Sequence, residues 1–588
     1  MLYAVSALLS AVVCFPLFGG YLLHRDAVAT PTSPLTAAAF GIDGAPPRAV
    51  PQDGAVAVAS HVVDGGVLVA AVIALSLFAA GVGYGRLARR LVPGAGNAGA
   101  VAAAVVAIWN PYVAERLLQG HWSLLTGYAA LGWIVLSVLS LREDPGWRRW
   151  AGLTGLFAVA GLTPTGSLLA LAVAVAAWVS TRTPSSSGST IEGTHSPSGP
   201  TTGGTRSHTA VEPGRRRSAA TTTPRVETST LLVPVLWLLT ASPWLVGAAV
   251  ADSTTTGSGS GLFAARAEPG LGTFGSVLGL GGIWNAAAVP VSRTSGWAAV
   301  ATGCLLLVVV GGTVVVIRQR RELDRVVGAL AVLAAVTIVA VTLLATTPGD
   351  HLIDALTGYL PGAGLVRDTT KYLALAVPFY AIAAAAAVSA VRRWLPAAVG
   401  TVAVALLVAA PLPDLAWGVG GGLRAVDYPA AYARVAALIG HSDRAVAVIP
   451  STLMRDYRWN DGPSLSPLPR MIDAPVILDG SLIVDCVRVD APTGRARQVI
   501  DAVDDGADPA RLAVLGVGWV VTETRDGVSV APIDGAPPYP SPATGAWIAA
   551  GTAHGIWLAA LLAGLASAVA GFTSRRTRAK SSAVDGHE

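Results

Sequence analysis

The stretch VLVAAVIALSLFAAGVGYGRLARR, residues 67–90, decides the fold class. Residues 67–84 carry no charge, and Arg86, Arg89 and Arg90 follow them. A bilayer is crossed by about 20 mostly apolar residues in a helix. Arginine clusters beside such runs mark the cytoplasmic side. The stretch therefore predicts a transmembrane helix whose C-terminal end faces the cytoplasm.

The rest of the 588-residue chain has the same character, with 53% hydrophobic and 13% charged residues and a mean hydropathy of +0.59. Soluble domains carry about 25% charged residues, so this composition excludes a soluble multidomain enzyme. The net charge of +5 comes largely from short arginine clusters beside apolar runs. This distribution predicts the lipid bilayer as a partner and no binding to nucleic acid.

Twelve apolar runs are long enough, or nearly so, to be membrane spans. Basic residues follow the second, fourth, eighth, tenth and last of them, which places these ends on one side of the membrane. We therefore predict an α-helical polytopic protein of the plasma membrane with about 12 transmembrane helices and with both termini in the cytoplasm. The predicted spans are 2–23, 67–84, 98–109, 122–141, 151–161, 167–179, 231–250, 298–317, 326–344, 372–391, 395–410 and 549–570.

The segments between the spans predict the domain organisation. Residues 181–229 are rich in Ser, Thr, Gly and Pro, which predicts a disordered cytoplasmic insert. Helix-like and strand-like segments alternate over 429–439, 445–449, 509–515 and 517–522, which predicts a small extracytoplasmic α/β domain. The predicted parts are a transmembrane bundle 1–180 with a first external loop 24–64, the insert 181–229, a second bundle 230–410, the domain 411–548, a last transmembrane helix 549–571 and a basic tail 572–588.

The first external loop begins with His24, Arg25 and Asp26, directly after the first apolar run. A carboxylate so close to the membrane surface can reach a reactive group attached to a lipid phosphate. The alternative is an ordinary solvated loop.

A second polar group lies in WNPYVAERLLQGHW, residues 109–122. The Asn-Pro pair ends a helix, and Glu115, Arg116 and His121 then gather on an external hairpin between aromatic residues. An aromatic belt with polar residues that reach into water is the alternative.

A third group lies in GLVRDTTKYLAL, residues 364–375. Arg367 and Lys371 are four residues apart, so on an α-helix they share a face and would hold a phosphate. The alternative is a salt bridge between Asp368 and Lys371. In the C-terminal domain, residues 455–461 are dense in Arg, Trp, Tyr and Asp; this composition suits sugar binding by Arg455, Asp456 and Trp459, and a solvated loop explains it equally well.

Together these features resemble the GT-C class of integral membrane glycosyltransferases, in particular the mannosyl- and arabinofuranosyl-transferase-like proteins of mycolic-acid-type cell envelopes. The resemblance rests on the multispan bundle, the aspartate of the first external loop, the charged groups of later external loops and the external C-terminal domain. The class usually has an acidic pair in the first loop, whereas this chain has Asp26 alone after Arg25.

The resemblance implies a polyprenyl-phosphate sugar donor and transfer to a cell-envelope glycan or lipid acceptor on the extracytoplasmic side. It implies that Asp26 is the catalytic general base and that cations hold the departing phosphate. A divalent metal is compatible with this chemistry, but the sequence has no metal-ligand spacing and we predict no metal site. The predicted substrate- or phosphate-binding residues are Arg25, Glu115, Arg116, His121, Arg367, Asp368 and Lys371.

Two other functions stay open at this point. The missing acidic pair favours a non-catalytic membrane scaffold that binds envelope glycan or protein partners. A lipid or glycan transporter would place ionisable residues in mid-span and would show repeated halves. The spans are almost free of charge, which counts against the transporter.

Overall fold

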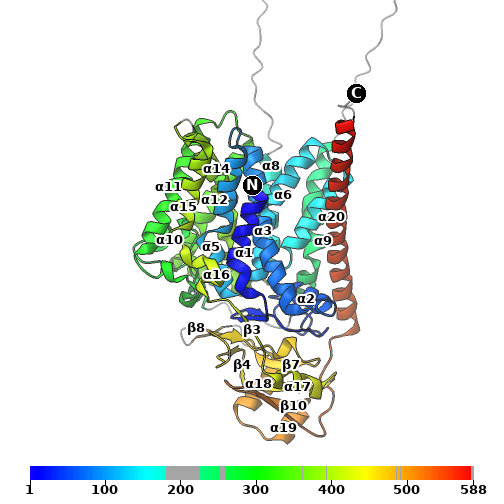
Figure 1. Ribbon diagram of the computed structural model, residues 1–588. Helices are drawn as coiled ribbons and strands as arrows, with labels where there is room; N and C mark the ends of the chain where they lie inside the picture. Colours follow the sequence, from blue (N-terminus) through cyan, green and yellow to red (C-terminus); the bar gives the residue numbers. More distant parts are fainter. Residues whose placement is uncertain are drawn as a thin grey trace, which may run out of the picture.

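The computed structural model describes residues 1–180, 225–251, 259–359, 362–392, 394–484, 487–489 and 492–584. The long helices form a bundle, and most of the strands gather with α17, α18 and α19 at one end of it (Figure 1). The N-terminus and the C-terminal end of α20 (Thr544–Val584) lie at the opposite end of the bundle. Most of the predicted insert, 181–224, lies outside the described residues, and the chain is already helical from Arg225.

Among the described residues, eight helices are long and apolar enough to cross a membrane, and one bent pair would make nine. The bent pair joins Ala397–Ala409 to Pro413–Gly420 at 81°. The eight spans fall in α3 (Gly65–Leu91), α4 (Gly96–Ile108) continued by α5 (Pro111–Gln119), α6 (Trp122–Glu143), α9 (Arg225–Val250), α11 (Trp297–Arg318), α12 (Arg325–Leu344), a 3₁₀ helix (Thr369–Ala376) continued by α14 (Val377–Val391), and α20 (Thr544–Val584).

The predicted count of twelve is therefore not confirmed. The other four predicted runs form shorter helices: α1 (Leu2–Cys14), α7 (Trp147–Ala160), α8 (Pro164–Ser180) and α15 (Ala397–Ala409). The run 2–23 was predicted too long. Its last residues form strand β1 (Tyr21–His24), because an apolar segment after a helix can pair as a strand as readily as it can continue the helix.

The arginines that follow the apolar runs meet at one end of the bundle. Arg90, in the last turn of α3, pairs with Glu143 at the end of α6, with 2.6 Å between Nη2 and Oε1. Arg142 pairs with Asp324, the residue before α12, with 3.0 Å between Nη1 and Oδ2. These basic helix ends therefore share one side, as the charge pattern predicts for a multi-pass membrane protein.

The strand region is an α/β unit. Strands β11 (Val528–Pro532), β10 (Val517–Glu523), β4 (Ala445–Thr452) and β7 (Val476–Asp479) form one sheet in that order, parallel from β10 to β7 and antiparallel at β11. The helices of this unit are α17 (Ala430–Ile439), α18 (Gly494–Asp504) and α19 (Pro509–Val514). The four helix and strand segments that the sequence predicts in this region are all present. Smaller strand pairs join β5 (Met454–Arg455) to β6 (Ser464–Leu465) and β8 (Leu482–Val484) to β9 (Val487–Val489).

A three-stranded sheet ties the first external loop to this unit. Strand β1 pairs with β2 (Ala27–Val28) on one side and with β3 (Ala425–Val426) on the other. The remaining α-helices of the described residues are α2 (Gln52–Ser60), α10 (Gly272–Leu278), α13 (Thr347–Tyr359) and α16 (Ala416–Gly420). The hairpin of β1 and β2 therefore lies where the helical bundle meets the α/β unit.

Candidate active site

The turn between β1 and β2 places Asp26 at the junction of the bundle and the α/β unit. Arg25, in the same turn, has a positive φ of 47°, which is rare for a residue other than glycine and costs about 1–3 kcal/mol. Its backbone is held by the α/β unit, since Arg25 N–H donates to the carbonyl of Pro463 at 2.8 Å and Arg25 O accepts from the N–H of Leu465 at 2.9 Å. Its guanidinium donates to the carbonyl of Ala287 at 2.7 Å. Three hydrogen bonds to two distant segments of the chain thus hold the strained turn in place.

The carboxylate of Asp26 accepts two hydrogen bonds and still faces solvent. Oδ2 lies 3.1 Å from Nε2 of His121 and 3.3 Å from Nε2 of Gln119. The side chain of Asp26 is 41% exposed. Both hydrogen bonds end on the same oxygen, so the carboxylate is oriented by the protein and remains accessible to a ligand.

The hydrogen bonds of His121 define its tautomer. Its Nδ1 lies 3.2 Å from Nη1 of Arg116. A guanidinium only donates, so Nδ1 accepts and the proton of the neutral ring is on Nε2, which donates to Asp26. Burial and the charge of Lys371 hold the pKa of His121 below its ordinary value. The imidazole is therefore neutral at pH 7 and works as a donor to the carboxylate.

Arg116 connects this pair to the third predicted group. Its side chain is fully buried, and Nη1 donates to Oδ2 of Asp368 at 2.8 Å. Nη2 donates to the hydroxyl of Thr370, which in turn donates to Oδ1 of Asp368 at 2.6 Å. Nζ of Lys371 lies 4.0 Å from Oδ2 of Asp368, and its side chain is 26% exposed. We call the connected residues Asp26, Arg116, Gln119, His121, Asp368, Thr370 and Lys371 the Asp26 network.

The network keeps both carboxylates ionised. Asp26 is partly buried, which opposes its ionised form, but the hydrogen bonds from His121 and Gln119 and the charge of Lys371 outweigh this effect, so the pKa of Asp26 is below its ordinary value. Burial also opposes ionisation of Asp368. The charges of Arg116 and Lys371 outweigh this effect and hold the pKa of Asp368 well below its ordinary range.

The prediction that Arg367 and Lys371 share a face of an α-helix is wrong. Residues Thr369–Ala376 form a 3₁₀ helix, and Arg367 precedes it as a buried residue with 4% exposure. In a 3₁₀ helix residues three apart are aligned, which brings Lys371 toward Asp368 and not onto a face with Arg367. The salt bridge that the sequence left as the alternative is thus present. A phosphate-binding role for Arg367 stays a prediction.

The carboxylate of Glu115, the residue before Arg116 in α5, bonds to a loop. Its carboxylate accepts from the backbone N–H groups of Gly282 at 3.0 Å and Ile283 at 3.2 Å. The same loop continues to Asn285, whose side-chain amide donates to Gln119 at 2.8 Å. Glu115 therefore anchors the loop that supports Gln119, and the predicted direct role of Glu115 in substrate binding stays a prediction.

Gly120 allows the close approach of α5 to the Asp26 turn. It has a φ of +85°, and a β-carbon at this position would lie 2.4 Å from the backbone nitrogen of Ala27 and 2.9 Å from that of Asp26. The backbone N–H of Asp26 also donates to the carbonyl of Gln119 at 3.3 Å. Only glycine meets both demands, so Gly120 sets the position of the carboxylate.

Sequence reasoning missed Gln119, Gly120 and Thr370. Gly120 carried a signal, because a glycine after an apolar helical run is typical of a left-handed helix end. Gln119 and Thr370 carried none that could be separated from ordinary polar residues. Their roles depend on the meeting of segments that lie far apart in the chain.

The predicted glycan-binding residues divide between buried and exposed positions. Arg455 is buried, and its Nε lies 2.7 Å from Oε2 of the buried Glu523. Asp456 is exposed and pairs with Arg525, while Trp459 is half-buried and stacks on Tyr457 at 4.6 Å between ring centroids. The guanidinium of Arg455 is committed to Glu523. Sugar binding by these residues stays a prediction.

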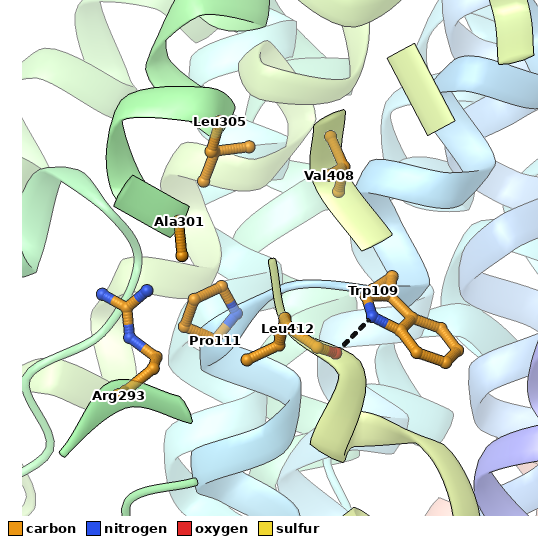
Figure 2. A pocket seen from close by; sticks show the side chains of 7 residues that line it. All are labelled: Trp109, Pro111, Arg293, Ala301, Leu305, Val408 and Leu412. Atoms are coloured by element: carbon orange, nitrogen blue, oxygen red, sulfur yellow. Dashed lines mark hydrogen bonds between the residues drawn. The ribbon is translucent and has the colours of Figure 1, made fainter. Parts of the chain in front are cut away.

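A cavity inside the helical bundle is too small for a substrate. Figure 2 shows it between Trp109, Pro111, Arg293 and apolar side chains of α11 and α15. Its volume is about 10 Å³, which is room for about one water molecule. Arg293, the charged residue of the lining, is bound to Glu268 with 2.6 Å between Nε and Oε1. This cavity belongs to the packing of the bundle.

The described residues contain no group of three or more His, Cys, Asp or Glu side chains placed to hold a metal ion. The Asp26–His121 pair lacks a third ligand of these types, and both imidazole nitrogens are engaged with other side chains. A divalent metal, which the resemblance allows, does not fit this set of residues, and no step proposed below uses one.

Comparison with protein-family models and with curated proteins gives no match for the chain. Among solved structures, the chain is similar to a mutant of the arabinofuranosyltransferase AftD from mycobacteria, with a TM-score of 0.50 and 17% identity. The match covers 89% of this chain and 36% of that one, so this chain spans about a third of its length. AftD is a GT-C enzyme, and the likeness supports a GT-C-like fold for this multi-pass membrane protein.

Proposed function

We propose that this protein is an integral membrane glycosyltransferase that moves a sugar from a polyprenyl-phosphate donor to a cell-envelope glycan or lipid acceptor on the extracytoplasmic side. The observation that carries the proposal is the Asp26 network. It holds one solvent-accessible, ionised carboxylate within the electrostatic influence of a partly exposed lysine, in the β1–β2 turn where the bundle meets the α/β unit. The GT-C-like fold supports the same class of reaction.

In the proposed reaction a hydroxyl oxygen of the acceptor attacks the anomeric carbon of the donor sugar. The bond between this carbon and the phosphate oxygen breaks, and the electron pair leaves with the polyprenyl phosphate. Asp26 takes the proton of the attacking hydroxyl. The negative charge that develops on the phosphate is stabilised by the ammonium of Lys371.

The surroundings of Asp26 keep the carboxylate ionised and orient it, as a general base requires. His121 and Gln119 orient one carboxylate oxygen, and the neutral tautomer of His121 adds no positive charge that would compete with Lys371 for the phosphate. Arg116 is buried and bonded to Asp368 and Thr370, so we assign it a positioning role. The predicted orientation, with this end of the bundle outside the cytoplasm, is part of the proposal.

The test is release of polyprenyl phosphate by the purified protein in liposomes. A panel of polyprenyl-phosphate pentoses and hexoses is supplied with mixed envelope glycans and lipids. We expect release with at least one donor and transfer of the labelled sugar to an acceptor. Absence of release with every donor, from protein shown to be folded, would refute the transferase and favour the scaffold that binds envelope glycan.

A further inference from the structure

A second, larger cavity lies between the first external loop and the α/β unit. Its volume is about 180 Å³. The lining comes partly from α2 and the loop before it, with Ser33, Asp53 and Val56, and partly from the α/β unit, with Leu465, Ser466, Pro469 and Arg470. Trp122, at the start of α6, closes the end toward the bundle. Two structural units that are far apart in the chain thus form the cavity together.

The polar groups of the cavity are few and fixed. Nη2 of Arg470 lies 2.8 Å from Oδ2 of Asp53, and these side chains are 19% and 20% exposed. Nε2 of Gln52 donates to Oδ1 of Asp53 at 2.9 Å, and Gln52 accepts from the hydroxyl of Ser123. Most of the remaining lining is apolar, from Val28, Val56, Val69 and Trp122 among others. Apolar walls with a small number of oriented polar groups are typical of a ligand site.

The cavity borders the Asp26 network through the backbone. Val28 and Trp122 line the cavity, and they lie two residues after Asp26 and one residue after His121. Leu465 also lines it, and its backbone N–H donates to the carbonyl of Arg25. A molecule bound in the cavity would therefore sit beside the turn that presents Asp26.

Charge and size restrict what the cavity can hold. Asp53 and Arg470 neutralise each other, so the charged pair of the lining attracts neither a phosphate nor a cation strongly. The volume is below the roughly 300–1,000 Å³ that is usual for drug-sized ligands, which excludes a polyprenyl chain. A single neutral sugar ring fits these limits, because its hydroxyls can bond to the ion pair and Gln52 while its apolar faces contact the walls.

We infer that this cavity binds one neutral sugar residue of the acceptor and so presents the acceptor hydroxyl to Asp26. This inference rests on the proposed transferase function, because it names the place of the acceptor in that reaction. If the acceptor sugar binds in this cavity, acceptor specificity is determined by Asp53, Arg470 and Val56.

The test measures binding of single-ring probes, independently of transfer. Methyl glycosides of arabinofuranose, galactofuranose and mannopyranose are titrated into the full-length protein in nanodiscs, and saturation-transfer NMR gives their dissociation constants. The variant Val56→Phe fills the cavity from the wall, and Ala38→Leu fills it from an exposed lining position that tolerates a larger side chain. The matched control is Val58→Phe, on the same helix but 55% exposed and outside the lining.

We expect wild type and Val58→Phe to bind at least one glycoside with similar affinity. Both cavity-filling variants should weaken that binding by about tenfold or more, since excess volume in a fitted pocket is worth about that factor. Equal binding by all four proteins, or no binding by wild type, would overturn the inference. Release of polyprenyl phosphate is measured in parallel. If wild type releases no polyprenyl phosphate, the transferase is refuted. If wild type releases it and Val56→Phe binds the glycoside as wild type does, only the acceptor cavity is refuted.

Discussion

Two of the carboxylates that are held by several polar side chains, Glu523 and Asp26, differ in how far they are exposed to solvent. Glu523 in the α/β unit is completely buried and accepts from Arg455, Tyr432, Tyr457 and Ser466 at 2.7–3.0 Å. Asp26 accepts from two side chains, through one oxygen, and stays 41% exposed. The first carboxylate has both oxygens fully used, and the second is left open on one side.

This difference separates a structural role from a chemical one. A buried ion pair gains little net stability, but removing one partner leaves a buried charge without compensation and is strongly destabilising. Glu523 therefore holds the α/β unit together. An oriented carboxylate that water and ligands can reach contributes little to stability and is available to accept a proton. The following predictions test this contrast.

The largest effect is expected for Asp26→Asn. The amide keeps the size and much of the hydrogen bonding of the side chain but cannot accept the proton of the acceptor, so the transfer rate should fall by about 10²–10⁴-fold. Asp43→Asn is the matched control, since it changes an exposed acid of the same loop. Transfer by Asp26→Asn at the rate of the control would remove Asp26 from the chemistry.

Glu523→Gln should instead lower stability. The substitution leaves the guanidinium of Arg455 buried without its counter-ion, which costs about 3–5 kcal/mol. Chemical denaturation followed by a probe in the α/β unit measures the effect. The exposed pair of Arg458 and Asp526 provides the control, since Asp526→Asn should cost no more than about 1 kcal/mol. Equal stability of the two variants would contradict a structural role for Glu523.

Gly120→Ala should displace the Asp26 turn without removing any of its polar groups. The added β-carbon would meet the backbone nitrogens of Ala27 and Asp26, and a shift of about 1 Å at a catalytic group costs up to about 10²-fold in rate. Gly551→Ala in α20 is the control, because a β-carbon there meets nothing within 4 Å. A normal transfer rate in Gly120→Ala would show that the close approach of α5 is not needed.

The smallest effect is a change in pH dependence. Asp26 is active when ionised and its pKa is lowered, so the wild-type rate should stay level from pH 8 to pH 6 and fall only at strongly acidic pH. His121→Ala removes a hydrogen bond that favours the ionised carboxylate, so the pKa of Asp26 should rise and the acid limb should move to higher pH. A rate profile across pH measures the shift, and an unmoved limb would contradict the hydrogen bond from His121 as a cause of the lowered pKa of Asp26.

Local sequence patterns predicted the helices and strands that form through interactions between residues close together in the chain. Uninterrupted apolar runs predicted the long helices, and alternating patterns predicted α17, β4, α19 and β10 in the α/β unit. The patterns misjudged residues 21–23, where pairing with β3 from a distant part of the chain turns the end of an apolar run into a strand. They also gave Lys371 the wrong helix type.

The sequence predicted most of the residues of the candidate site, but it did not predict how they contact one another. Asp26, Arg116, His121, Asp368 and Lys371 were all singled out by their chemistry and their position beside apolar runs. Their connection depends on contacts such as Arg116 with Asp368, which are 252 residues apart, and no spacing in a single sequence encodes such a contact. For the same reason, no pattern in the sequence indicated that the carboxylate of Glu115 bonds to the loop at Gly282, and its predicted role in substrate binding stays a prediction.

The most direct test compares the two carboxylates in one experiment. Asp26→Asn and Glu523→Gln are reconstituted in the same liposomes, and release of polyprenyl phosphate per folded molecule is measured beside the free energy of unfolding. The account predicts that Asp26→Asn is as stable as wild type and inactive, and that Glu523→Gln is less stable and active in its folded fraction. An active Asp26→Asn together with a folded but inactive Glu523→Gln would contradict it and would move the chemistry to the α/β unit.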